Sequence, residues 1–547
     1  MRLYVCALLC ALGIAAGLGA SPQVTVSAGD PVLDDIRYVA REAGVAILSF
    51  TPPLSRDEIE TLLAGVETET LSVPAQEALR RIRERLNPPM RFTEDFFGLS
   101  FHAVVQTEAA FRSNTAILWA SGDADGVQRP AFLHLPLDFY FADVVHLNLE
   151  PTLNLDPTFN EADGRFLTNV PYQLERTDRF FPFRAFAAAG GKWWHFEIGR
   201  DQVSFGTART GNLLLSDTPD FYDFARLSFF SRHFKYSTMA IQNPLDLSPR
   251  YYDPHGLADG VTKESVQRYI YIHRLDFKIL NKVAIGITEG TSVGDAPLEI
   301  RYLNPLLIMH NLWSGEDYPS WGKKSQNMMN SSIFSIDVNW TPVSAFSFHT
   351  QIVIDEFTLP WEVAGESGNM SPRGMGYLAG VEYSRAIGVW GRNFAAQFYG
   401  EAAYTEPYLY VDNSPFAAFV LMRRVNRGSI KSRYRWMGHP EGRDAVVFAA
   451  GSRFSTARLA FSADVSFVIH GKHRIYWDWD RGSSFAAEQT PTGTPEKRVT
   501  ASLGVEWKPF PQVTLSAEAG GGATLNANHG DNDEFGGWVG LGVKYVF

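Results

Sequence analysis

The sequence feature that most constrains the fold is an alternation of apolar and polar side chains, which recurs from residue 91 to the end of the chain. In one such segment Leu459, Phe461 and Phe467 fall on one face of an extended strand, while Asp464 and His470 fall on the other. Successive side chains of a strand point to opposite faces, so each segment reads as a strand with one apolar face. Residues 91–547 are therefore predicted to be all-β.

The connections between these strands favour a barrel in a membrane over a soluble sandwich. About 18 antiparallel strands can be marked, an even number that is typical of single-chain bacterial barrels. The links between strands alternate in length. Some are very short, such as the single residue Asn281 or residues 342–344, and the others are long, such as residues 204–225 and 406–444. Tight periplasmic turns and elaborate extracellular loops produce this alternation. We predict an all-β transmembrane β-barrel with apolar side chains facing lipid and charged ones facing the lumen.

The last strand, 537–547, fits the same architecture. Val539, Leu541 and Val543 lie on one face of it, and the chain ends on Phe547. An amphipathic terminal strand that ends in phenylalanine resembles the recognition signal of bacterial outer-membrane barrels. We therefore expect the barrel assembly machinery to be a partner through Phe547. Because the number of strands is even and the short turns are expected on the periplasmic side, both termini are predicted to lie in the periplasm.

The amino-terminal segment 1–20 has the form of a secretory signal peptide, because Arg2 precedes an apolar run and small residues end at Ala20. Both cysteines, Cys6 and Cys10, lie inside it, so the exported chain is expected to lack disulfides and thiol nucleophiles. No later stretch approaches the ~20 apolar residues that a spanning helix needs. We expect a closed barrel in the outer membrane of a diderm bacterium, with outer-membrane lipid around it.

Residues 21–90 differ from the rest of the chain and read as helices. Asp30-Pro31 suits a helix start, Ser55 to Glu58 forms a capping box, and a third helix over 74–86 ends before two prolines. This segment is predicted to be a small periplasmic helical module. The chain then divides into a signal peptide (1–20), a helical module (21–90) and an outer-membrane barrel (91–547).

Composition and motifs argue against several functions. The formal net charge of -11 disfavours a nucleic-acid partner. The sequence contains no zinc-protease, nucleophile-elbow, P-loop or dinucleotide-binding motif. We therefore predict a protein that is not an enzyme and that uses no cofactor and no metal.

Carboxylates on the expected lumen face leave alternatives open. A pair of them could carry out hydrolysis, although lumen carboxylates more often pair with arginines or set ion preference. The candidate acid–base residues are Asp337, Asp355, Glu356, Glu382 and Glu401. The residues predicted to face the lumen are Asp337, Asp355, Glu401, Asp464 and His470. In a late loop, 529–534 (HGDNDE) could bind calcium through its oxygens or form an ordinary polar turn.

The long loops are rich in aromatic residues, many of which stand beside Asp or Arg. Aromatic rings stack on the apolar faces of sugars, while neighbouring polar groups bond the hydroxyls. Alternatively, such rings pack the loops together or lie at the membrane interface. The candidate glycan-binding residues are Trp313, Trp321, Tyr434, Trp436, Tyr476, Trp477 and Trp479.

Several short motifs resemble those of the capsule assembly protein Wzi family. In that family a Gly-Arg is followed by Trp-Gly-Pro-Gly and then by Gly-x-Leu-Leu-Leu-Ser. Here Gly199-Arg200, Phe205-Gly206 and 211–216 (GNLLLS) stand in the same order. The further markers are His273-Arg274, Glu289, 302–305 (YLNP), Asp355-Glu356, Glu401 and Pro407-Tyr408. The chain departs from the family at Phe205 and at Thr207-Ala208, where the family usually has Trp and Pro-Gly.

The resemblance implies an outer-membrane barrel of about 18 strands that anchors surface polysaccharide as a lectin, with an appended periplasmic helical element. We therefore expect a non-enzymatic barrel that binds or anchors surface polysaccharide through its extracellular loops. The alternative is a porin or substrate-specific outer-membrane channel, in which the charged lumen sets selectivity. The sequence does not indicate an oligomeric state.

Overall fold

The structure is a computed structural model. It describes residues 23–94, 96–115, 130–142, 144–155, 164–171, 175, 177–178, 183–246, 265–294, 297–306, 308–309, 330–356, 373–389, 391–411, 418–427, 429–475 and 488–547. The expected signal peptide lies outside these ranges. Among the residues within them, no helix is both long enough and apolar enough to cross a membrane.

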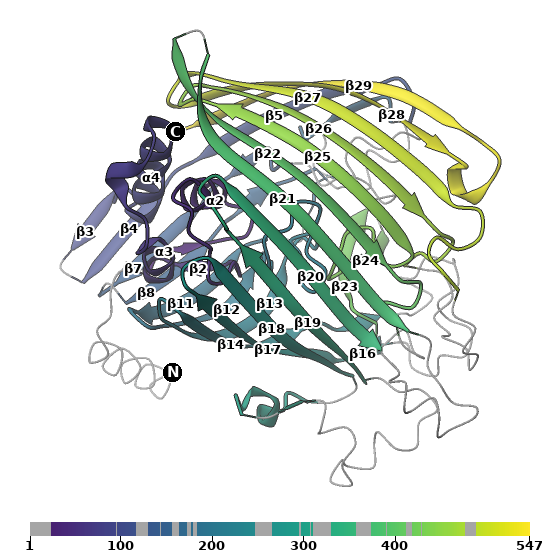
Figure 1. The fold of residues 1–547 in the computed structure, drawn as a ribbon, viewed down its shortest axis with the longest axis horizontal. Helices are drawn as coiled ribbons and strands as arrows, with labels where there is room; N and C mark the ends of the chain where they lie inside the picture. The colour runs from purple at the N-terminus through teal and green to yellow at the C-terminus, as the bar shows by residue number, and fades with distance from the viewer. Residues whose placement is uncertain are drawn as a thin grey trace.

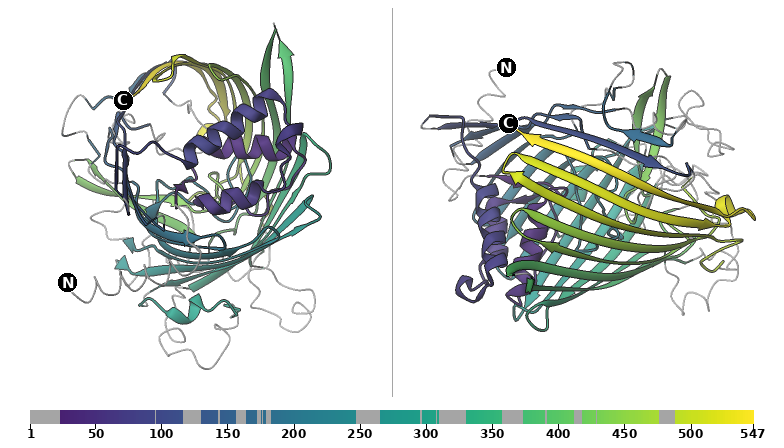
Figure 2. Two further views of the ribbon diagram at one scale, coloured as in Figure 1. Left: turned by 90° about the vertical axis from the view of Figure 1, so that its left-hand side faces the viewer. Right: turned by 90° about the horizontal axis from the view of Figure 1, so that it is seen from above.

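One large antiparallel sheet curls around a central space and dominates the molecule (Figures 1 and 2). Its last strand, β29 (Glu534–Val546), pairs with an early strand, β5 (Val104–Arg112). Directly before β5, strand β4 (Phe97–Phe101) pairs with β7 (Leu137–Phe141) on the other side. Hydrogen bonds therefore link the last strand of the chain to an early strand that follows the helical segment.

The other strands of the ladder lie in or close to the ranges that the alternation predicted. The long ones are β11 (Ala185–Gly191), β12 (Trp194–Asp201), β13 (Tyr222–Phe230), β14 (Phe234–Gln242), β17 (Arg268–Ile279), β18 (Val283–Gly294), β19 (Asn330–Trp340), β20 (Phe346–Glu356), β21 (Gly374–Val389), β22 (Arg392–Thr405), β25 (Ala445–Ser455), β26 (Leu459–His470), β27 (Glu496–Phe510) and β28 (Val513–Leu525). Each pairs with the next in this order. Strand β8 (Val145–Leu149) pairs with both β7 and β11. The short strands β6 (Leu133–His134) and β9 (Thr152–Leu153) pair with each other, and β6 also pairs with β5.

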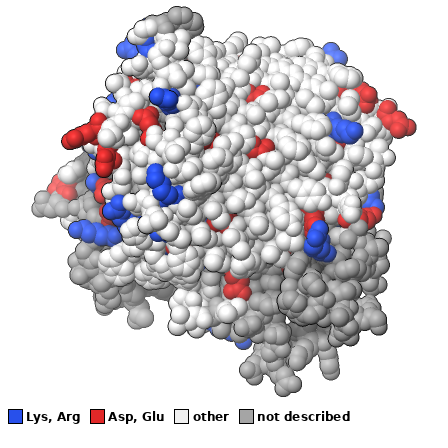
Figure 3. All heavy atoms as spheres, in the orientation of Figure 1, with Lys and Arg blue, Asp and Glu red and all other residues white. Residues whose placement is uncertain are grey.

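The outer face of the sheet carries the apolar side chains. In β27 the side chain of Leu503 is 67% exposed, and in β29 that of Leu541 is 64% exposed. Figure 3 shows a broad band with few charges over this face, and the charged side chains gather toward its two edges. An apolar outer band between charged edges is the surface that a barrel presents to lipid.

A bundle of three helices lies inside one mouth of the sheet, at the end where the chain terminates (Figure 2). The helices are α2 (Val32–Glu42), α3 (Arg56–Leu63) and α4 (Val73–Leu86). Helix α3 begins at the capping box, where the Ser55 hydroxyl accepts the backbone N–H of Glu58 at 3.4 Å. Ile36, Ile59 and Ile82 form the bundle's core, which also includes Tyr140 and Ala395 of the surrounding wall.

Hydrogen bonds fix this helical module to the short turns of the barrel. The N–H of Ala46 donates to the carbonyl of Asn281 at 2.9 Å, and the N–H of Ala345 donates to the carbonyl of Arg41 at 2.8 Å. The Lys282 ammonium donates to the carbonyl of Gly44 at 2.6 Å. The module is thus seated in the mouth and is not merely appended to the barrel.

One link that was expected to be an extracellular loop turns inward. Residues 202–221, which we call the inner loop, run back through the lumen to the helical module. The N–H of Ser204 donates to the carbonyl of Pro52 at 3.1 Å, and the N–H of Gly206 donates to the carbonyl of Phe50 at 2.8 Å. Farther along, the N–H of Ser216 donates to Met437 at 2.7 Å.

Met437 follows a hairpin that the alternation did not predict, β23 (Val420–Arg427) and β24 (Ser429–Trp436), within the expected loop 406–444. The inner loop and the base of this hairpin meet the wall in a hydrophobic core. Its members include Phe205, Leu213 and Leu215 of the inner loop and Ile241, Ile270, Val353 and Val447 of the wall. The prediction that charged side chains face the lumen and apolar ones face lipid does not hold for this layer, because the folded-in segments need an apolar surface to pack against.

Candidate functional site

Glu401, on the inner face of β22, holds the tip of the inner loop. Its carboxylate accepts the backbone N–H groups of Arg209 at 2.9 Å and Thr210 at 2.7 Å. The Thr210 hydroxyl also donates to it, and His349 Nε2 lies 2.7 Å from its other oxygen. A buried carboxylate with this many donors forms strong, charge-assisted hydrogen bonds. Glu401 therefore anchors the loop to the wall.

A second anchor lies one strand away, where the module, the inner loop and the wall meet at Glu382 of β21. The Arg41 guanidinium of α2 forms an ion pair with Glu382 and donates to the Ser384 hydroxyl at 2.8 Å. Arg209 also pairs with Glu382 at 2.8 Å and reaches Asp34 of α2 at 2.7 Å. The same few charges thus fix three separate segments.

The arginines of this junction lie close enough to influence one another. Burial, and after it the positive charge of Arg209, lowers the pKa of Arg37 to about 10. Arg37 still carries its charge at neutral pH, and it lies 3.6 Å from Asp34. The junction is therefore balanced by carboxylates and offers no isolated cation to a ligand.

The side chain of Gln351 in β20 fixes the apolar half of the inner loop. Its amide nitrogen donates to the carbonyl of Phe205 at 3.2 Å, and its oxygen accepts the N–H of Leu213 at 2.8 Å. Gly206 stands between them with φ 126°, and a Cβ there would collide with Gln351. A glycine is needed at this position for both reasons. Two parts of the motif that resembles the Wzi family, Phe205-Gly206 and 211–216, thus lie in the inner loop, whereas Gly199-Arg200 lie in β12.

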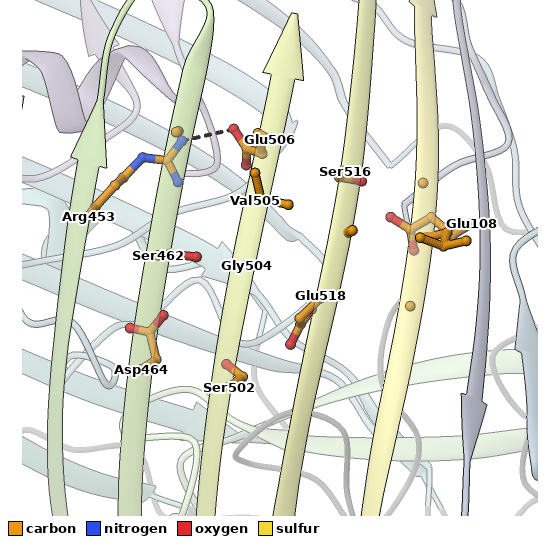
Figure 4. A pocket seen from close by; sticks show the side chains of 15 residues that line it. Glu108, Arg453, Ser462, Asp464, Ser502, Gly504, Val505, Glu506, Ser516 and Glu518 are labelled. Carbon is orange, nitrogen blue, oxygen red and sulfur yellow. Dashed lines mark hydrogen bonds and ion pairs between the residues drawn. The ribbon is translucent and has the colours of Figure 1, made fainter. Parts of the chain in front are cut away.

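The filling of the lumen is incomplete along the wall of β25 to β29. Two adjoining cavities of about 240 and 800 Å³, which we call the lumen groove, share Arg453, Glu506 and Ser516 as lining residues. Figure 4 shows Asp464, Glu518 and Glu108 around the smaller cavity. Arg453 and Glu506 form an ion pair at 2.9 Å, and both are half exposed.

Small side chains explain why the groove lies on this wall. The inward positions of β26 to β29 include Ser462, Ser502, Gly504, Ser516, Gly540 and Gly542, all of which line the smaller cavity. Opposite, the inward positions carry Ile272, Met239 and Phe224, which pack against the inner loop. At the end near the C-terminus the groove has a basic row of Arg458, Lys508 and Lys544.

The five predicted lumen residues lie in β19, β20, β22 and β26. Asp337 pairs with Arg274 at 2.5 Å, and Glu401 anchors the inner loop. Asp464 accepts the Tyr399 hydroxyl at 2.9 Å in the groove, whereas His470 is buried and bonded to backbone carbonyls. Asp355 lies at the loop end of β20. Asp337, Glu401 and Asp464 thus have different partners and do not form one site.

Most of the predicted glycan-binding residues, Trp313, Trp321, Tyr476, Trp477 and Trp479, lie outside the described residues. The other two, Tyr434 and Trp436 of β24, are only 4% and 6% exposed and belong to the lumen core. In this structure their rings pack the hairpin and have no free face for a sugar.

The possible calcium segment 529–534 is a turn in which Asp533 accepts the N–H of Asn526 at 3.1 Å. Across the part of the chain that the structure describes, no three His, Cys, Asp or Glu side chains are grouped to hold a metal ion.

Sequence reasoning missed Arg41, Arg209, His349 and Gln351. The last two alternate with Phe348 and Thr350 along β20, so their inward direction could have been read from the period of the strand. Arg41 and Arg209 carried no such signal, because their partners lie on strands far away in the sequence.

Comparison with known proteins supports the fold. No family model matches the chain, and no curated protein matches it. Among solved structures, Wzi of Escherichia coli, an outer-membrane carbohydrate-binding β-barrel involved in group 1 capsule assembly, superimposes with a TM-score of 0.57 at 14% identity. The superposition covers 95% of this chain and 98% of Wzi. A second match, to OprD of Pseudomonas aeruginosa, has a TM-score of 0.37 at 10% identity and covers 82% of this chain and 95% of OprD. The Wzi superposition shows that this chain has the fold of an outer-membrane β-barrel.

Proposed function

We propose that this protein is a non-enzymatic outer-membrane barrel that binds or anchors a surface polysaccharide at the end of the barrel that carries the long loops. The observation that supports the proposal best is the filled lumen. The helical module, the inner loop and the base of the β23–β24 hairpin lie within the lumen and are held by buried ion pairs and a hydrophobic core. Such filling favours a rigid platform for binding over a wide channel.

We infer a closed barrel of about 18 strands, supported by the pairing of β29 with β5 and of β4 with β7. Both termini and the helical module then lie in the periplasm, and the long links face outward. There the barrel assembly machinery would recognise Phe547. Likeness to the Wzi structure and the inner-loop motif both favour a divergent member of that family.

The loop tryptophans Trp477 and Trp479 are the residues we expect to stack on the glycan, because acidic and basic residues surround them. Changing both to alanine should weaken binding of the producing cell's own polysaccharide by about tenfold or more, since tryptophans at the centre of interfaces cost roughly 2 kcal/mol or more when truncated. Titration of the purified variant with that polysaccharide measures the change.

A matched control is the change of Trp340 and Trp507 to alanine. Both are exposed on the outer face near the opposite end of the barrel, so glycan affinity should stay as in the native protein. Equal loss of affinity in both variants, or no binding by the native protein, would contradict a glycan site in the loops.

The lumen groove favours a second function, that of a narrow, selective channel. It is lined by charged and small polar side chains and could conduct hydrated ions past the module. Unit charges about 4 Å apart interact by about 1 kcal/mol in water. Asp464→Asn should therefore lower cation preference by up to about fivefold in planar-bilayer recording.

Asp531→Asn, in a turn outside the groove, serves as the control for Asp464→Asn and should leave the preference unchanged. An absence of stable current steps in the native protein would eliminate the channel.

A further inference from the structure

A groove of about 800 Å³ lies on the outer face of β12 to β14, away from the lumen. Its floor is hollow because Ala225 and Ala240, which are partners in the register, stand between rows that carry the larger side chains of Leu227 and Asp223. Ala185 lines the groove beside Arg200. Phe196, Ile198 and Leu227 complete the apolar floor. These side chains share the face of the sheet that is exposed to lipid in an outer-membrane barrel.

One end of this groove is polar. At the loop end of β12, Arg200 forms a two-pronged ion pair with Asp223, at 2.8 and 2.9 Å. Gln242 lies beside Asp223 in the register of the next strand and also lines the groove. The groove therefore passes from apolar in the middle of the wall to polar toward the loops.

Its roof is a segment of the long β18–β19 link that folds back over the outside of the barrel. This strap, residues 297–306 with 308–309, includes the short helix η4 (Ile300–Leu303). Leu298 and Leu303 of the strap line the groove. Tyr302 is fully buried, with its ring stacked on that of Tyr271 in β17 at 4.8 Å.

The strap is built to lie against hydrocarbon. Its most exposed side chains are apolar, with Ile300 79% and Leu306 92% exposed. Asn304 is also exposed, while Arg301 is paired with Glu299 of the strap itself. Its N–H groups find partners on the wall, since that of Glu299 donates to the Tyr271 hydroxyl at 2.8 Å and that of Met309 to the Glu289 carboxylate at 3.0 Å. A backbone N–H group that stays unpaired in lipid is energetically costly. The Tyr271 hydroxyl and the Glu289 carboxylate on the outer face supply acceptors for these two N–H groups.

We propose that this groove holds an acyl chain of a lipid from the surrounding membrane, with the lipid headgroup at the Arg200–Asp223 pair. Water would find few polar partners along the alanine floor, and an empty space of this size would forfeit packing contacts. An acyl chain is the apolar, flexible group that the surrounding bilayer supplies. In the orientation proposed above, the polar end places the lipid in the outer leaflet.

Native mass spectrometry of the full-length protein in detergent, titrated with dioleoylphosphatidylcholine, tests the proposal. The native protein should retain a single lipid more tightly than any other. Ala225→Trp, which fills the floor, should weaken that site about tenfold, and Leu303→Ala, which opens the roof, should weaken it about threefold.

Ala501→Trp is the matched control, because Ala501 lies on the outer face of β27 far from the strap. It should retain the lipid as the native protein does, which separates loss of the site from loss of the fold. Equal retention by Ala225→Trp and the native protein would overturn the proposal. So would equal loss in the control, or a dimer without lipid, which would identify a second copy of the chain as the occupant.

Discussion

Replacing Arg41 with alanine should detach the helical module from the barrel wall. Arg41 is 6% and Glu382 2% exposed, and removing one member of a buried ion pair costs about 3–5 kcal/mol. Arg209 still pairs with Glu382, so we expect the lower end, about 3 kcal/mol. The loss should appear as faster hydrogen exchange of the α2 amides and as earlier proteolysis of the module, while the strands stay protected.

Arg80→Ala supplies the comparison for Arg41→Ala. Arg80 forms its ion pair with Glu84 on the exposed face of α4, where both side chains are about 60% exposed. Pairs of this kind contribute about 0.5 kcal/mol or less. If both variants released the module to the same extent, the buried junction would not be what holds it.

Replacing Glu401 with alanine should free the inner loop. Besides the Thr210 hydroxyl, three donors, the N–H groups of Arg209 and Thr210 and the His349 ring, would lose their acceptor inside the lumen. A buried donor left without a partner costs about 1–3 kcal/mol, so the total should reach at least about 3 kcal/mol. The Arg209 and Thr210 amides should exchange much faster, and planar-bilayer recording should show larger and noisier current steps.

Glu506→Ala removes a carboxylate from the same lumen without touching the inner loop. Its pair with Arg453 is half exposed, so the expected loss is at most about 1 kcal/mol and the loop amides should stay protected. Slow exchange of the Arg209 amide in Glu401→Ala would show that the hydrophobic contacts of Phe205 and Leu213 suffice to hold the loop.

Local pattern predicted the strands well because each strand carries its own signal. In β29 the alternation of Leu541 and Val543 with Gly542 and Lys544 decided which face turns outward, and the exposed side chains agree. The capping box at Ser55 likewise located the start of α3. Both features depend on residues only a few positions apart.

The interior could not be predicted in the same way, because its contacts join segments that are distant in the sequence. Nothing near Arg41 indicates that it meets Glu382, and the apolar run 213–215 reads equally well as part of an exposed loop. Tyr434 and Trp436 illustrate the same difficulty, since an aromatic pair in a predicted loop fits a sugar site as well as a packed hairpin. Only the folded barrel separates these readings.

The measurement that tests the central claim most directly is the distribution of surface polysaccharide in cells that lack this chain. If the barrel binds or anchors the glycan at the cell surface, such cells should make a normal total amount but release most of it into the medium. Restoring the native chain should return the polysaccharide to the cells. An unchanged cell-attached fraction in its absence would contradict the proposed function.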